Sequence, residues 1–458
     1  MNLTSVSIPL SALFFVLYVA VSVAIGVVSS RKETDEEFMI AGRKVHGILM
    51  MATMAAGWFD GVTLSIYLAY VYQYGFAALS LFVGIACGFL LFRHYAPRIK
   101  AIADRRQAYS MSEYFYYVLG KQNGLMFSVF LLVQYFGYLV INFILSGKVL
   151  AALFPFLSYP AAVAIGGAII LTYLLLAGFQ AVVKTDLFQL LIMIFMTVLA
   201  STFFAGKVNV SAAEFDVGRM GIGNIIGFLA IAGFGVMVAP DIWQRVFAAR
   251  DQVALRRGFS YTAIILPALA IVITVVGLAT KQALPQIRAE DALVQAFFTL
   301  LPFGIKEFAA VLLYAVSLSS SDTVTFVVSS IVTRDLKNYT NRFNEDSNRR
   351  LTRMLMIGFV LLAILVATTY QQIIQIALAL GSLNLALFPV VFATLYWTLK
   401  PRAVFWSLVV VLVSVVGLGT MNSLDPQTAA LSLPIALVCL LLFQLILPRP
   451  AIIGPQQE

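Results

Sequence analysis

The sequence predicts an all-α polytopic membrane protein, and two observations carry that prediction. Hydrophobic residues make up 61% of the 458 residues and charged residues only 11%, whereas a soluble domain of this size has about a quarter charged residues. Predominantly apolar windows of about 20 residues, long enough to cross the hydrocarbon core of a bilayer, recur along the chain. We therefore expect a single transmembrane domain over residues 1–458, with about thirteen transmembrane helices.

Hydropathy places each expected span in turn. The first apolar run follows MNLTSVSIP, which has no Lys or Arg, so we expect an uncleaved helix there rather than a signal peptide. The second expected span is long and interrupted. The thirteen expected spans cover about 5–28, 46–75, 77–95, 122–153, 158–177, 180–206, 221–243, 257–280, 306–333, 354–370, 372–399, 402–420 and 429–447.

The basic residues predict how the chain is oriented. With the N-terminus outside and the C-terminus inside, all but six of the 30 Lys and Arg residues fall on the inner side, as the positive-inside rule requires. The net charge of +9 is then mostly a topology signal, and no soluble basic face remains for nucleic acid. We expect a multi-pass protein of the plasma (inner) membrane, in contact with lipid, with no obligate protein partner evident.

Two of the expected spans are interrupted in comparable ways. One contains AAGWFDG at 55–61, and the other contains AGFGVMVAPDIW at 232–243. Paired helices interrupted by Gly and Pro in two halves of a membrane protein are typical of an inverted-repeat transporter with its binding site at the breaks. The alternative is that Gly and Pro are simply common in membrane helices.

Few ionisable residues lie deep in the expected spans. Asp60, Asp186 and Asp322 are deep and Asp241 lies near a helix end. A charged group at the centre of a membrane helix costs at least about 2.5 kcal/mol and therefore indicates a function. We expect no Lys or Arg at comparable depth, so a bound cation is the missing partner of these acids.

The stretch SLSSSDTVTFVVSS at 317–330 is polar inside an otherwise apolar span. At 3.6 residues per turn, Ser319, Ser320 and Thr323 share one face with Val316 and Ser330, and Asp322 lies at its edge. Hydroxyl and carboxylate oxygens suit hard cations, and the unwound turn at 55–61 could add free carbonyls. The alternative is that these hydroxyls bond to carbonyls one turn back in their own helix.

Other polar residues have weaker signals. Asp186 could instead be a helix cap together with Thr185. Gln134, Tyr138 and Asn142 form a stripe at a spacing of four that could line a cavity, or could form interhelical hydrogen bonds. Trp58, Ser382 and Asn384 are lesser candidates for the same cavity.

Four collinear segments resemble the sodium/solute symporter family, which includes proline, sugar and choline carriers. They are EEFMIAGRKV (36–45), AGFQAVVKTDLFQ (177–189, with Ala177 in place of the first glycine of the family motif), PDIWQRVFAARD (240–251) and SSSDTVTFVVSSIVTRDL (319–336). The resemblance implies a leucine-transporter-like core of two inverted five-helix repeats, about 46–206 and 221–399, with one additional N-terminal and two C-terminal helices. It also implies sodium-coupled symport of a small organic solute by alternating access.

The resemblance also assigns residues to ion sites. The sodium ion would be held by backbone oxygens of Ala56 and Phe59, the carbonyl of Val316 and the hydroxyls of Ser319 and Ser320. Some members hold a second cation at the position of Asp186, where the partners match Ser319, Asp322 and Thr323. The family's pattern does not extend to the break itself, because Trp58 and Asp60 fall at variable positions.

The substrate and the class of protein leave alternatives open. A carboxylate at Asp60 would suit a solute with an amine or quaternary ammonium group, or could tune the ion site, or could be protonated. A proton-coupled carrier and a membrane sensor built on the same scaffold are the alternative functions. An enzyme is not expected, because the sequence has no GxSxG, HExxH or phosphate-loop motif.

Overall fold

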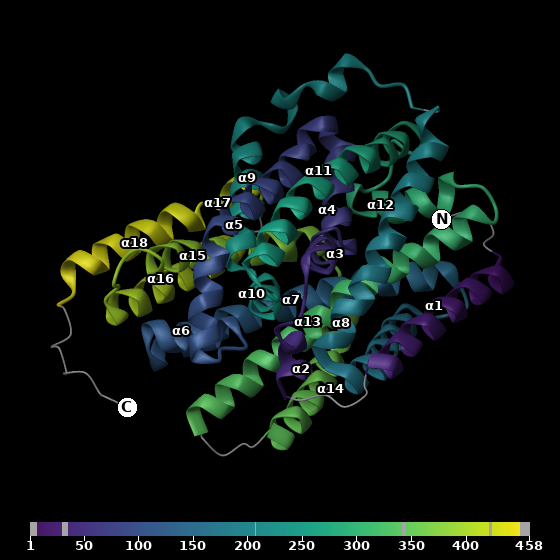
Figure 1. The fold of residues 1–458 in the computed structure, drawn as a ribbon. Coiled ribbons are helices and arrows are strands. Elements are labelled where there is room, and N and C mark those ends of the chain that lie inside the picture. The colour runs from purple at the N-terminus through teal and green to yellow at the C-terminus, as the bar shows by residue number, and fades with distance from the viewer. Residues whose placement is uncertain (1–6, 30–34, 207, 341–344, 421–423, 449–458) are drawn as a thin grey trace.

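Two interrupted helices lie near the centre of the computed structural model (Figure 1). It describes residues 7–29, 35–206, 208–340, 345–420 and 424–448, and a few side chains within these ranges, including that of Ser319, lie outside the description. The first interrupted helix consists of α3 (Gly47–Trp58) and α4 (Gly61–Tyr74). The second consists of α9 (Ile222–Val238) and α10 (Pro240–Ala248), bent by 43°. Both breaks expected from the sequence are confirmed.

The remaining helices surround this pair. Figure 1 shows α1 along one flank of the bundle and α16 and α18 along the opposite flank. The other α-helices are α1 (Ile8–Ser29), α2 (Asp35–Ile40), α5 (Ser80–Arg106), α6 (Met111–Leu119), α7 (Lys121–Leu153), α8 (Tyr159–Ala205), α11 (Gln252–Ala283), α12 (Ala292–Gln295), α13 (Ile305–Thr340), α14 (Glu345–Thr369), α15 (Ile373–Thr394), α16 (Pro401–Thr420), α17 (Pro426–Ala430) and α18 (Ser432–Ile446). Short 3₁₀ or π turns are η1 (Ala41–Arg43), η2 (Gly75–Leu79), η3 (Ala212–Phe215), η4 (Val217–Met220), η5 (Ala289–Asp291) and η6 (Ala296–Leu300).

Each break has a local cause in the sequence. Asp60 has extended backbone and caps α4, since its carboxylate accepts a hydrogen bond from the backbone N–H of Thr63 at 2.7 Å. Ala239 precedes Pro240 and is extended, because the proline ring disfavours helical backbone in the residue before it. The breaks therefore follow from one cap and one proline.

The multi-pass character is confirmed, whereas the number of spans stays a prediction. Nine helices of the described chain are long and apolar enough to cross a membrane, or ten if α9 and α10 count as one span. One of these stretches, Gly61–Arg106, joins α4 and α5. Another, Val182–Ala205, is the second part of α8, which has 47 residues and whose first part, Tyr159–Leu175, is also apolar. A straight helix of that length would extend about 70 Å, more than twice the thickness of the hydrocarbon core. We therefore assign α8 to the two spans expected at 158–177 and 180–206.

The helices α5 and α9 pack with almost no space between their backbones. A Cβ atom at Gly88 would lie 2.2 Å from the carbonyl oxygen of Gly233, and one at Gly233 would lie 3.1 Å from that of Gly84. Contacts with backbone atoms cannot relax by turning a side chain. The small residues therefore determine how closely the broken helix α9 lies against α5.

We expect Gly88→Ala to destabilise the protein by about 1–3 kcal/mol, the usual cost of overpacking. The thermal midpoint of the purified protein measures this. Gly358→Ala is the matched control, because a Cβ there meets no atom within 4 Å. Equal midpoints for the two variants would contradict the close packing.

Candidate functional site

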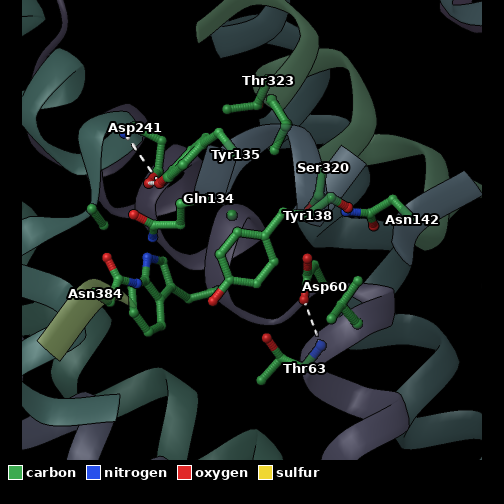
Figure 2. Close-up of a pocket in the computed structure, with 15 residues that line it drawn as sticks. Asp60, Thr63, Gln134, Tyr135, Tyr138, Asn142, Asp241, Ser320, Thr323 and Asn384 are labelled. Atoms are coloured by element: carbon green, nitrogen blue, oxygen red, sulfur yellow. Dashed lines mark hydrogen bonds between the residues drawn. The ribbon is translucent and has the colours of Figure 1, made fainter. Parts of the chain in front are cut away.

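A cavity lies where the two broken helices meet α7, α13 and α15. Its volume is about 90 Å³, room for several water molecules at 10–15 Å³ each. Figure 2 shows its polar side chains converging from these elements on one space. The lining residues are Gly57, Trp58, Asp60, Val62, Thr63, Gln134, Tyr135, Tyr138, Asn142, Ala239, Asp241, Ser320, Thr323, Val324 and Asn384.

The break between α3 and α4 leaves backbone oxygens available beside this cavity. The Phe59 N–H donates to the Ala55 carbonyl at 2.8 Å, and the next bond of this kind runs from Leu64 to Asp60 at 2.9 Å. Between them, no backbone hydrogen bond of the described residues uses the carbonyl of Ala56 or Phe59. Both residues are fully buried. These are the two backbone oxygens that the family resemblance assigns to the sodium ion.

Helix α13 contacts the break directly. A Cβ at Gly61 would lie 2.7 Å from the Ser317 hydroxyl oxygen and 3.0 Å from the Ser317 Cα. One turn along, Ser320 lines the cavity and lies beside the Asp60 carboxylate. Val316 is fully buried in the same helix. The Ser319 side chain lies outside the described residues, so its predicted role as a ligand stays a prediction.

Six hydroxyls of α13 fall into two groups. Ser317, Ser321, Ser329 and Ser330 bond to carbonyls one turn back in the helix, at 2.7–3.2 Å. For these four the alternative of bonding within the helix is therefore correct. Ser320 and Thr323 form no such bond in the part of the chain that the structure describes, and both line the cavity. Among the described hydroxyls of α13, these two line the cavity and are placed to bind a ligand there.

The expectation that no Lys or Arg lies at the depth of the acids is wrong. Arg245, which the loop assignment placed on the inner side, is fully buried in α10. Its guanidinium lies 3.0 Å from a carboxylate oxygen of Asp186 and 3.0 Å from one of Asp241, and also donates to the Thr53 hydroxyl at 2.8 Å. Asp186 accepts a further hydrogen bond from Thr53. An internal cation therefore already compensates both carboxylates.

Asp186 and Asp322 do not line the cavity, unlike Thr323. Asp186 lies within α8, whose N-cap is Ser158, so the cap alternative for Asp186 is wrong. Asp322 accepts hydrogen bonds from the Tyr173 hydroxyl at 2.9 Å and from the Thr323 N–H at 2.5 Å. The structure thus places one of the three second-cation candidates at the cavity and leaves the other two out of its lining.

The predicted substrate residues are mostly brought together. The stripe of Gln134, Tyr138 and Asn142 lines the cavity, as do Trp58, Asp60 and Asn384. Ser382 is buried but is not among the lining residues. Gln134 has no hydrogen-bond partner within the described residues, which disfavours the interhelical alternative for it.

Sequence reasoning missed several residues of the site, chiefly Thr63, Tyr135 and Arg245. Tyr135 lines the cavity and donates a hydrogen bond to Asp241. The pairing of Asp241 with Arg245 at a spacing of four on one helix was a readable signal. The positive-inside assignment instead places Arg245 in an inner loop, outside the membrane.

Asp60 differs from the other cavity acid in its electrostatic surroundings. Asp241 is compensated by Arg245 and Tyr135. Asp60 is buried, and no Lys or Arg is among the residues that line the cavity. Its neighbours in the lining include three aromatic rings, those of Trp58, Tyr135 and Tyr138. The cavity therefore combines one uncompensated carboxylate with aromatic faces.

A second cavity of about 90 Å³ continues from the first along α4, α5 and α9. The two share Trp58, Val62, Thr63, Tyr138 and Asn384, and the rest of the second lining is apolar. It includes Leu81 and Ile85, near the start of α5, the end of that helix remote from its basic residues. This apolar space offers a path between the polar cavity and that end of the bundle.

Comparisons with known proteins agree on one family and fold. The sequence profile of the sodium:solute symporter family matches residues 38–410. The sodium/pantothenate symporter of Haemophilus influenzae is 23% identical over 319 residues, 66% of this chain and 66% of that protein. The chain thus matches just under two thirds of that relative's length.

Solved structures extend the likeness over almost the whole chain. A Na⁺-coupled sialic acid symporter in its substrate-bound outward-open state has a TM-score of 0.80 at 14% identity, covering 96% of this chain and 99% of that one. Mhp1, a nucleobase-cation-symport-1 family transporter in a closed conformation with bromovinylhydantoin bound, has a TM-score of 0.59 at 14% identity, covering 88% and 92%.

Proposed function

The chain belongs to the sodium:solute symporter family, and on that premise we propose that it carries a small organic solute across the membrane together with sodium, by alternating access. The leucine-transporter-like fold expected from the sequence is confirmed by the structural neighbours. One observation carries the proposal: the unused carbonyls of the α3–α4 break, the Ser320 and Thr323 hydroxyls of α13 and a polar cavity lie together in the described structure.

In this proposal sodium binds between α3 and α13. Its ligands are the carbonyls of Ala56, Phe59 and Val316 and the hydroxyls of Ser319 and Ser320. Oxygen donors of this kind replace the hydration shell of a hard cation. Bound there, the ion holds the broken helix against α13 and completes the adjacent cavity for the solute.

We further propose that a single sodium ion is transported. The second site that the resemblance implies, at Asp186, Asp322 and Thr323, lacks a free charge at Asp186 because Arg245 pairs with it. One charge crossing 100 mV supplies about 2.3 kcal/mol, and a tenfold sodium gradient adds about 1.4. One ion therefore sustains roughly a 500-fold gradient of a neutral solute, and a cationic solute gains a second 2.3 kcal/mol from the potential.

The solute in this proposal bears an amine or quaternary ammonium group. Asp60 is the cavity carboxylate without a cationic neighbour in the lining. Trp58, Tyr135 and Tyr138 add ring faces that attract a cation. The alternative roles of Asp60, tuning the ion site or carrying a proton, rest on its proximity to Ser320.

We expect Asp60→Asn to weaken binding of cationic solutes by about 30-fold or more, since losing one partner of a desolvated charge pair costs 2 kcal/mol or more. Asparagine caps a helix as well as aspartate does, so α4 keeps its N-terminus. The change is measured by comparing the uptake of a cationic solute with that of an uncharged analogue of the same shape. An unchanged preference would mean that Asp60 serves the ion site instead.

A sodium titration tests the function without knowledge of the solute. Purified protein is titrated with NaCl or KCl at fixed ionic strength while tryptophan fluorescence is followed, because Trp58 lines the cavity. We expect a saturable, sodium-specific change that is lost in Ser319→Ala/Ser320→Ala. Equal responses to both salts, or a response that the variant retains, would favour a proton-coupled carrier or a sensor.

The repeats and the orientation complete the proposal. The first repeat covers about 46–206 and the second about 221–399, and each begins with an interrupted helix. The N-terminus lies outside and the C-terminus inside, in the plasma (inner) membrane. The distribution of Lys and Arg along the sequence supports this orientation.

A further inference from the structure

A basic pocket lies on the perimeter of the helix bundle, separate from the central cavity. It has a volume of about 480 Å³ and is formed by about two and a half turns of α5 and the start of α11. Its lining residues are Leu90, Arg93, His94, Pro97, Arg98 and Arg256. The three guanidinium-bearing side chains are exposed, and they belong to two neighbouring helices that run in opposite directions.

The three arginines of the pocket share the lining of one space. Within the described residues, Arg93, Arg98 and Arg256 form no ion pair. The nearby acids are already engaged: Asp104 pairs with Arg43 and Lys100, and Asp251 pairs with Arg250. Three like charges therefore face one pocket, and no acid of the described chain forms an ion pair with them.

An apolar wall continues from the pocket toward the middle of the membrane. On α5, Leu90 and Val83 are 51% and 46% exposed, and they lie one and three turns before Arg93. On α11, Tyr261 and Ile264 are 47% and 69% exposed and follow Arg256 by one and two turns. The basic pocket thus lies at one end of an exposed apolar surface formed by α5 and α11.

We propose that this pocket binds the phosphate of an anionic phospholipid, with the acyl chains lying along Leu90, Val83 and Ile264. Guanidinium groups match phosphate oxygens in bidentate geometry, and basic pockets between transmembrane helices bind anionic headgroups. A free phosphate would satisfy the same arginines but would leave the apolar wall unused, so the arrangement favours lipid. Because α5 packs against α9 and α11 against α3, the lipid contacts the helices that hold both broken segments in place.

Native mass spectrometry of the full-length protein in detergent tests the proposal. The protein is titrated with phosphatidylglycerol or phosphatidylcholine of identical chains. The pocket variant is Arg93→Gln/Arg98→Gln/Arg256→Gln. The control variant, Arg105→Gln/Arg106→Gln/Arg350→Gln, removes the same charge from exposed residues outside the pocket. We expect the pocket variant to bind phosphatidylglycerol at least tenfold more weakly and the control less than threefold. Equal losses in both variants would overturn the proposal.

A second measurement uses only the unaltered protein and so does not depend on how the variants fold. Its thermal midpoint is recorded with phosphatidylglycerol, with phosphatidylcholine and with millimolar inorganic phosphate. We expect stabilisation by phosphatidylglycerol alone. Equal stabilisation by inorganic phosphate would show a site for a free anion, and equal stabilisation by phosphatidylcholine would show unspecific lipid contact; either result overturns the proposal.

Discussion

Sodium-driven uptake is expected to fall more than a hundredfold when Ser319 and Ser320 are both replaced by alanine. The two hydroxyls are proposed ligands of a desolvated cation. The loss of each oxygen costs about 1.5–3 kcal/mol, the range for hydrogen bonds to charged groups, so two losses weaken sodium binding by about 3–6 kcal/mol. Uptake into proteoliposomes under an imposed sodium gradient measures this directly.

Two other serines of α13 provide the matched control. Ser329 and Ser330 are also adjacent and buried, but their hydroxyls bond to the carbonyls of Thr325 and Phe326 within the helix. We expect Ser329→Ala/Ser330→Ala to retain most of the uptake. If Ser319→Ala/Ser320→Ala transports normally, or if both double variants fail alike, sodium does not bind between α3 and α13 as proposed.

The features that the sequence predicts well are those with a local cause. The break at 59–60 follows from a capping aspartate and the break at 239 from a proline, so each was readable from a few neighbouring residues. The stripe of Gln134, Tyr138 and Asn142 follows from helical spacing. These side chains do line the cavity, because exposing a polar face of a membrane helix to lipid is costly.

The feature that escaped prediction depends on contacts between distant segments. Arg245 lies four residues after Asp241, but its partner Asp186 is 59 residues away in the chain, and Thr53 lies 192 residues away. Hydropathy places the RVFAAR segment beside the membrane, and only the bend at Ala239 carries α10 into the protein interior. Whether a buried acid is compensated therefore depends on tertiary contacts between segments that are distant in the sequence. The sequence could locate the acids without telling which one lacked a partner.

Arg245→Gln is expected to lower the stability of the protein by about 3–5 kcal/mol, the usual cost of breaking a buried ion pair. The substitution leaves the carboxylates of Asp186 and Asp241 buried without their cation. Adding Asp186→Asn removes one of the two stranded charges. The double variant should therefore recover about 0.5–3 kcal/mol of the loss, the range for residues in direct contact. Thermal midpoints of the purified proteins give this comparison.

The same variant also tests the proposal that one sodium ion is carried. Asp186 has a carboxylate oxygen, Oδ1, without a hydrogen-bond partner among the described residues, and removing the guanidinium frees the other oxygen from its ion pair. We therefore expect sodium to stabilise Arg245→Gln more than it stabilises the unaltered protein, because the emptied position now favours a cation. Arg245→Lys retains the charge and should not gain this response. If sodium stabilises all three proteins equally, Arg245 does not take the place of a second ion, and the argument for a single transported sodium fails.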